Sequence, residues 1–357
     1  MDDHRMFHGL PVVPVDDDPP EHTLFRLADY QQILAIRLRL LESDEEAAAE
    51  VDRFALKLRD LARQMTEDGL RHGPPVAWRI AAEDRARYGG VSVPFDEVFE
   101  RFLYQVDTTQ VTALVVGFWG GLHETDKPDP VELLVKAADA LPELRAVYLG
   151  DIGADEQELS WIIHKDVTPL IEAFPNLERL DVRGGGMWLR PFRSERLKTL
   201  RLMSGGLPAD VVRAVAASDL PALERLDLWL GDPHYGGDAA VADLLPVLSG
   251  ERLPALRHLG LENSTLEDEI AAAVAGAPIV ARLETLSLAR GLLTDTGVEA
   301  LLAGQPLTHL EKLDLHHHYV GERMAGWVRD LLPGVQVDLS DRIVVNEGYA
   351  PYVEDSE

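Results

Sequence analysis

The clearest pattern in the chain is a six-residue phrase, Leu-x-x-Leu-x-Leu, that recurs between residues 144 and 339. Within each copy, apolar residues alternate with other residues; in one copy Leu226 and Leu228 alternate with Asp227 and Trp229. A period of two predicts a β-strand that buries its leucines on one face and presents the intervening side chains on the other. The first leucines of the copies are Leu144, Leu177, Leu197, Leu223, Leu256, Leu283 and Leu310.

Each predicted strand is followed by a turn and then by a segment with helical periodicity. In residues 294–303, Thr294 occupies an N-cap position, and Val298, Leu301 and Leu302 form one apolar face. Comparable helices are predicted near residues 131–141, 167–174, 208–217, 238–249, 267–276 and 321–332.

The distances between copies identify the type of repeat. Successive first leucines are 33, 20, 26, 33, 27 and 27 residues apart. Repeats of about 20–29 residues with this phrase are leucine-rich repeats, and the two longer steps leave room for loop insertions. We therefore predict an α/β fold, a right-handed leucine-rich-repeat solenoid with a parallel sheet on the concave face and helices outside.

The rest of the chain divides into parts around this solenoid. Residues 1–75 are predicted to form an N-terminal segment with a helical hairpin over 24–70, where apolar residues have heptad-like spacing. The hairpin is expected to cap the first turn, although it could instead cover the concave face. The solenoid is expected over 76–340, followed by an acidic C-terminal tail over 341–357.

Irregular repeats are expected at both ends of the solenoid. Residues 76–80 and 111–116 are predicted to be strands, with a helix around 95–105 between them. The apolar residues 7–13 could add a short edge strand, and residues 335–339 supply a last strand.

The turns after the strands lack the asparagine that commonly satisfies buried backbone groups in such repeats. The equivalent positions hold Gly185, Gly231, Ser264, Gly291 and His318. Other groups must therefore satisfy these turns.

Composition excludes several classes of function. The chain has 34 basic and 62 acidic residues, for a net charge of −28, which argues against nucleic acid and anionic membranes as partners. It favours a protein or peptide partner with a basic surface. The absence of cysteine excludes disulfides and thiolate metal sites. Without a signal-like start or an apolar run of about 18 residues, a cytoplasmic location is expected.

Several phrases are similar to a bacterial leucine-rich-repeat family with ribonuclease-inhibitor-like repeats. They are residues 7–12, 76–80, 167–170, 226–231 and 313–319. The resemblance implies a non-enzymatic repeat protein without a cofactor. It also implies an origin in gene neighbourhoods that often encode radical-SAM-type enzymes.

The candidate binding site is the concave face of the predicted sheet, because the repeat determines which side chains share that surface. Trp229 is the candidate anchor, a large aromatic on a polar face, unless the loop 232–238 folds over it. Arg201 lies between Asp181 and Asp227 in one column and is expected to pair with them. The candidate binding residues are Tyr148, Asp181, Arg183, Arg201, Asp227, Trp229, Glu262, Asp314 and His316.

A metal-assisted hydrolase is the alternative function, with the histidines of 316–318 or the His234 loop as its site. Adjacent strand residues point to opposite faces, so His316 and His317 should diverge, and His318 could fill the turn position of the missing asparagine. No other ligand stands at a known spacing, so we predict neither catalytic residues nor a metal. An accessory subunit of an enzyme complex is a further alternative.

Overall fold

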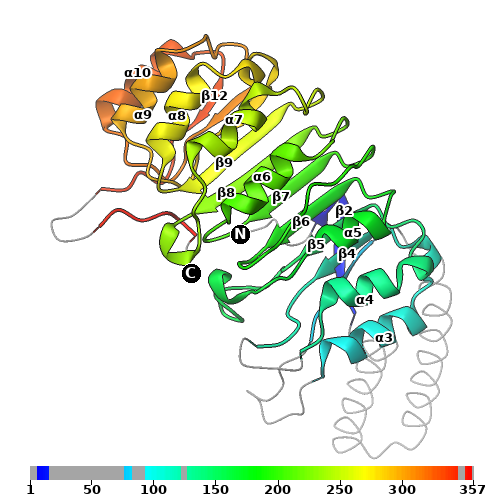
Figure 1. The fold of residues 1–357 in the computed structure, drawn as a ribbon. Helices are drawn as coiled ribbons and strands as arrows, with labels where there is room; N and C mark the ends of the chain where they lie inside the picture. Colours follow the sequence, from blue (N-terminus) through cyan, green and yellow to red (C-terminus); the bar gives the residue numbers. More distant parts are fainter. Residues whose placement is uncertain (1–5, 16–75, 83–92, 122–126, 345–349, 356–357) are drawn as a thin grey trace, which may run out of the picture.

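The alternating residues of the repeats form the strands of one curved sheet in a computed structural model of the chain (Figure 1). The structure describes residues 6–15, 76–82, 93–121, 127–344 and 350–355. The predicted helical hairpin lies outside these residues.

The sheet has 12 strands, and each strand pairs with its neighbours in chain order. β1 (Met6–Phe7) and β2 (Leu10–Pro14) form an antiparallel hairpin, and every later pair is parallel. This order confirms the solenoid and the predicted edge strand. The other strands are β3 (Ala77–Ile80), β4 (Ala113–Val116), β5 (Ala146–Leu149), β6 (Arg179–Arg183), β7 (Thr199–Met203), β8 (Arg225–Gly231), β9 (His258–Ser264), β10 (Thr285–Ser287), β11 (Lys312–Asp314) and β12 (Gln336–Asp338).

Helices connect most of these strands and line one face of the sheet (Figure 1). Each helix predicted between residues 95 and 332 is present, and Thr294 caps its helix by accepting a hydrogen bond from the Thr296 N–H. The α-helices are α3 (Phe95–Gln105), α4 (Pro130–Lys136), α5 (Thr168–Ala173), α6 (Ala209–Ala217), α7 (Val241–Ser249), α8 (Glu267–Ala275), α9 (Asp295–Leu302) and α10 (Glu322–Leu331). The 3-10 helices are η3 (Thr108–Gln110), η4 (Ala138–Ala140), η5 (Leu159–Trp161), η6 (Pro233–Tyr235) and η7 (Pro278–Arg282). In the part of the chain that is described, no helix has both the length and the apolar character required to cross a bilayer.

The core lies between the sheet and the helices. Leu226, Leu259, Leu286 and Leu313 are aligned across β8 to β11, and none of them is exposed to solvent. Neighbouring strands in a sheet are about 4.8 Å apart, whereas packed helices need about 8–10 Å. The helical side must therefore spread, which makes the opposite face of the sheet concave.

The turns after the strands are satisfied without the asparagine ladder, as predicted. His318 is buried, its Nδ1 accepts a hydrogen bond from the Val320 N–H at 3.0 Å, and its Nε2 donates to the Leu339 carbonyl at 3.3 Å. In an earlier repeat the Ser264 hydroxyl accepts from the Leu266 N–H at 3.0 Å. Different side chains thus satisfy the backbone groups of the turns in different repeats.

We predict that Leu286→Ala lowers the free energy of unfolding by about 2–5 kcal/mol, because it leaves a cavity between two repeats. Leu245→Ala is the matched control, since Leu245 is 54% exposed on α7 and should cost far less. Urea melts of both variants test the difference. Equal losses would contradict the burial of Leu286.

Candidate binding site on the concave face

The predicted concave residues share one surface, and the register of the strands defines their order. Tyr148 of β5 is paired with Asp181 of β6, which is paired with Arg201 of β7. Arg201 is in turn paired with Asp227 of β8. This column is the one expected from the repeat.

A second column runs two residues further along each strand. Arg183 is paired with Met203, and Trp229 is paired with Glu262. Asp314 and His316 belong to β11 and the turn after it, towards the C-terminal end of the sheet. All nine candidate residues therefore lie on or beside the concave side of the strands.

A hollow of about 660 Å³ opens on this face. It lies between the N-terminal hairpin, which is formed by β1 and β2, and the C-terminal segment, residues 350–355. Its walls include three aspartates, Asp151, Asp181 and Asp355. They also include five arginines, Arg179, Arg183, Arg201, Arg225 and Arg290. Arginines thus outnumber aspartates around this hollow, although the chain as a whole carries a charge of −28.

The N-terminal hairpin forms one wall of the hollow. Phe7 is buried against Ala77, Ala113 and Ala146, three aligned concave positions whose small side chains leave room for its ring. The Phe7 ring centroid lies 6.0 Å from that of Tyr148. Phe7 therefore covers the beginning of the concave face.

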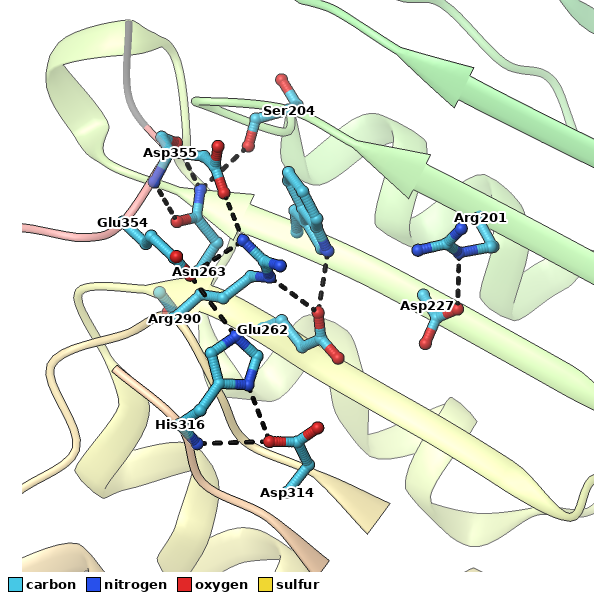
Figure 2. Close-up of polar contacts among 12 residues, drawn as sticks. Arg201, Ser204, Asp227, Glu262, Asn263, Arg290, Asp314, His316, Glu354 and Asp355 are labelled. Atoms are coloured by element: carbon cyan, nitrogen blue, oxygen red, sulfur yellow. Dashed lines mark hydrogen bonds and ion pairs between the residues drawn. The ribbon is translucent and has the colours of Figure 1, made fainter. Parts of the chain in front are cut away.

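Asp227 is the centre of an ion-pair network across three strands. Its carboxylate accepts a hydrogen bond from Arg201 Nε at 3.0 Å (Figure 2). It also accepts from Arg225 Nε at 2.7 Å and from His258 Nε2 at 2.6 Å. Arg201 also reaches Asp181, with Nη1 3.4 Å from Oδ2. The ion-pair row predicted from the sequence is present.

The pKa of Asp227 follows from these neighbours. Burial alone would raise the pKa, since the carboxylate is almost inaccessible, but the hydrogen bond and charge of His258 and the charges of Arg225 and Arg201 lower it well below its usual range. Asp227 is therefore an anion at neutral pH. A carboxylate held in this state orders the sheet face and is a poor proton donor.

Trp229 is not the exposed anchor that its position suggested. Only 6% of the residue is exposed, and the Arg290 guanidinium lies 4.6 Å from the centroid of its ring. The indole Nε1 donates a hydrogen bond to Glu262 Oε2 at 2.8 Å. Arg290 projects from the turn after β10, two repeats away from Trp229, and it supplies a cover that the local sequence around the tryptophan does not reveal.

Glu262 also belongs to this buried cluster. Burial raises the pKa of its carboxyl, and the nearby negative charge of Asp227 raises it further. Arg290 Nε lies 3.7 Å from Glu262 Oε2 and limits the rise. Trp229, Glu262 and Arg290 thus form one packed unit, of which Figure 2 labels Glu262 and Arg290.

Arg183 differs from the other arginines of the hollow. Its Nη1 donates a hydrogen bond to the Ile152 carbonyl at 2.8 Å, and within the described part of the chain it makes no ion pair with a carboxylate. The Arg183 carbonyl accepts from His164 Nε2 at 2.8 Å, and burial lowers the pKa of His164 to about 4, which keeps this imidazole neutral. The backbone of Arg183 is fixed, while its half-buried guanidinium faces the hollow.

The predicted acidic tail is partly packed against the solenoid. Residues 350–355 cross the ends of β9 to β11, where Arg290 Nη1 lies 2.8 Å from Glu354 Oε2 and 2.6 Å from Asp355 Oδ2 (Figure 2). Asp355 also lines the hollow. The repeat pattern does not indicate this contact. It also does not indicate the interactions that are made on the concave face by Arg179, Arg225, His258, Asn263 and Arg290.

One group of side chains has the composition of a metal site. Asp314, His316 and Asp338 bring ligand atoms within 4.8 Å of one another. However, His316 Nδ1 donates to Asp314 Oδ1 at 2.7 Å and its Nε2 lies 3.4 Å from Glu354 Oε2, which raise the pKa of His316 to about 9. A protonated imidazole has no lone pair for a metal, so these residues fit an ion-pair cluster better.

The remaining candidate residues for hydrolysis serve structural roles. Asp232 accepts a hydrogen bond from the His234 N–H at 2.7 Å, and Asp238 accepts from the Ala209 N–H at 2.7 Å at the start of α6. The His317 and His318 rings bond to different backbone carbonyls, those of Tyr352 and Leu339. The three rings therefore contact different groups. His316 and His317 diverge as predicted, although both follow β11 and do not belong to a strand.

We predict that Trp229 resists acrylamide quenching in a variant that retains it as the single tryptophan. Arg290→Ala should raise the quenching constant severalfold, because it removes the guanidinium that covers the ring. Arg323→Ala, on the exposed side of α10, is the control and should have no effect. Strong quenching in the parent would show that Trp229 is open to solvent.

We also predict that the stabilisation contributed by His316 is lost at high pH. Because the folded-state pKa of about 9 exceeds the ordinary value of 6.5, this contribution is fully present below pH 6.5 and disappears as the pH rises through 9. The free energy of unfolding of the wild type should exceed that of His316→Gln by about 1–2 kcal/mol at low pH, since part of the ring is solvated. Urea melts of both proteins between pH 6 and 10 test this, and a constant difference would contradict it.

Comparison with known proteins gives a structural relative. The sequence matches no protein-family model and no curated protein. A crystal structure of a Bacteroides fragilis protein from a structural genomics consortium superimposes with a TM-score of 0.70 and 26% identity, covering 87% of each chain. A Leptospira interrogans leucine-rich-repeat protein aligns over 65% of this chain and 62% of its own at 15% identity, but its TM-score of 0.29 is too low to support an argument. The chain is thus similar over most of its length to a bacterial protein of known structure.

Proposed function

We propose that this protein is a non-catalytic scaffold that binds a segment of another protein on its concave face. The observation that carries the proposal is the hollow of about 660 Å³, open on a rigid sheet and walled by side chains from many repeats. Concave repeat surfaces of this kind suit extended partners.

Arg183 is the residue that we expect to receive the partner. The other four arginines of the hollow each contact at least one carboxylate of the chain itself. The Arg183 guanidinium has only the Ile152 carbonyl as a hydrogen-bond partner within the described residues, so its remaining N–H groups are available to a carboxylate. A partner segment with an acidic side chain would pair with it.

The chemistry of the hollow favours binding over catalysis. The buried carboxylate of Asp181 in its wall is paired with Arg179, and the buried carboxylate of Asp227 is paired with Arg201, another residue of the wall. Acid–base catalysis needs a group whose pKa is close to the working pH, and the pKa of Asp227 is far below it. The ion pairs around these carboxylates therefore favour a binding scaffold over a hydrolase.

The surface of the partner as a whole is expected to be basic. A chain with a net charge of −28 attracts positively charged proteins at a distance, while the arginine-rich hollow accepts an acidic group at close range. Association should therefore slow as the salt concentration rises. An enzyme complex, implied by the radical-SAM-type neighbours of the resembling family, would be one case of the same binding function.

The proposal is tested by affinity capture at low salt from the cytosol of the source organism, with wild-type protein, Arg183→Glu and Arg323→Glu as baits. We expect a stoichiometric partner with the wild type and the control Arg323→Glu. With purified components, Arg183→Glu should bind that partner roughly tenfold more weakly or worse, since a charge pair becomes a repulsion.

Two results would overturn this function. One is a failure to recover any stoichiometric partner from the cytosol. The other is a partner that binds Arg183→Glu as tightly as the wild type. If the recovered partner is an enzyme whose activity depends on the scaffold, the accessory-subunit form of the proposal is supported.

A further inference from the structure

The C-terminal segment meets three equivalent residues of consecutive repeats. Asn263, Arg290 and His317 are separated by 27 residues each. Asn263 lies at the end of β9, and Arg290 and His317 follow β10 and β11. All three have left-handed backbones, with φ of 56°, 68° and 51°. Non-glycine residues rarely adopt this conformation, and it places these three residues in one row at the strand ends.

Asn263 recognises the backbone of the segment. Its Oδ1 accepts a hydrogen bond from the Asp355 N–H at 3.0 Å, and its Nδ2 donates to the Asp355 carbonyl at 2.5 Å (Figure 2). The amide side chain thus imitates a strand that exchanges two hydrogen bonds with one residue of its neighbour. Such a contact accepts an extended peptide of any sequence.

The next two repeats continue the backbone recognition. The Arg290 carbonyl accepts from the Glu354 N–H at 2.9 Å. His317 Nε2 donates to the Tyr352 carbonyl at 3.2 Å, and the Tyr319 hydroxyl accepts from the Tyr352 N–H at 2.9 Å. The backbones of Tyr352, Glu354 and Asp355 are therefore held by this row of residues together with Tyr319.

Side chains add selectivity to this row. Val353 is only 2% exposed, so the row accepts an apolar side chain at that position. The two following carboxylates meet cations, Glu354 beside Arg290 and His316, and Asp355 beside Arg290. The bound sequence is an apolar residue followed by two acidic residues.

We propose that the row Asn263, Arg290 and His317 is a docking site for an extended peptide that carries an apolar residue followed by two acidic residues. In the free protein the chain's own residues 352–355 occupy it. A partner peptide of this chemistry binds by displacing them. The inference rests on the contacts of this segment and does not depend on Arg183, although Arg290 and Asp355 also line the hollow.

Displacement of the segment has a structural consequence for the rest of the concave face. Arg290 binds Glu354 and Asp355 while its guanidinium covers Trp229. A peptide that replaces both carboxylates keeps Arg290 in place. Loss of the segment without replacement leaves Arg290 with Glu262 as its remaining ion-pair partner among the described residues.

The test uses the full-length chain and a fluorescent peptide with the sequence of residues 350–355, blocked at both ends. The variant Glu354→Lys with Asp355→Lys releases the internal segment, because the lysines face Arg290 and His316. We expect this variant to bind the peptide at a ratio of one to one in fluorescence anisotropy. The wild type should bind it about tenfold more weakly or worse, since its tethered segment competes at a high effective concentration.

Further variants assign the peptide to the proposed row. Adding Arg290→Ala to the released variant should abolish binding, whereas adding the control Arg323→Ala should not. Adding Arg290→Glu restores charge complementarity with the two lysines, so the internal segment should close again and exclude the peptide. A peptide with Gln and Asn in place of its Glu and Asp should bind the released variant roughly tenfold more weakly or worse. Thermal melts of each variant show that the solenoid remains folded.

The outcomes decide the proposal. Absence of peptide binding by a folded released variant overturns it, as does binding that survives Arg290→Ala. Concentration-dependent dimerisation of the wild type through exchanged C-terminal segments, seen by light scattering, would assign the row to a second copy of the chain and also overturn it. None of these measurements depends on Arg183, so failure here is distinct from failure of the proposed function.

Discussion

The burial of one row of leucines per strand is the constraint on which the rest of this structure depends. Leu226, Leu259, Leu286 and Leu313 can all face the helices only if the strands are parallel and in strict register. That register has a second effect, because it also aligns every side chain on the opposite face. The concave surface is therefore a set of columns in which each residue has a neighbour from the repeat on either side.

Aligned columns create an electrostatic requirement. Like charges directly opposite one another on neighbouring strands are destabilising, whereas opposite charges are favourable. The column Asp181, Arg201 and Asp227 alternates in sign, and Arg225 and His258 complete the partners of Asp227. Most charged side chains of the concave face thus form ion pairs with one another. Arg183, which pairs with no carboxylate among the described residues, stands out against this background as a group able to accept a ligand.

The two ends of the described chain both fold onto the concave side. The N-terminal hairpin covers the first strands through Phe7, over positions occupied by alanine. The C-terminal segment covers the ends of β9 to β11 and binds Arg290, which in turn covers Trp229. The end repeats of a solenoid need a cover that keeps their apolar surface from solvent. Here the protection of the face also determines which part of it remains open, namely the hollow between the two ends.

The sequence by itself determined the architecture, because local periodicity is a direct consequence of which face a strand or helix buries. The strands, the helices of the regular repeats, the concave columns, the ion-pair row around Arg201 and the structural role of His318 all followed from spacing along the chain. The 27-residue spacing of Asn263, Arg290 and His317 was also readable, but nothing local indicated what these residues bind. The cover of Trp229, the partners of His316 and the docking of residues 350–355 were decided only by the tertiary structure. These contacts join residues from different repeats or from opposite ends of the chain, such as Trp229 with Arg290 and Asn263 with Asp355, and a period within one repeat carries no information about such pairs.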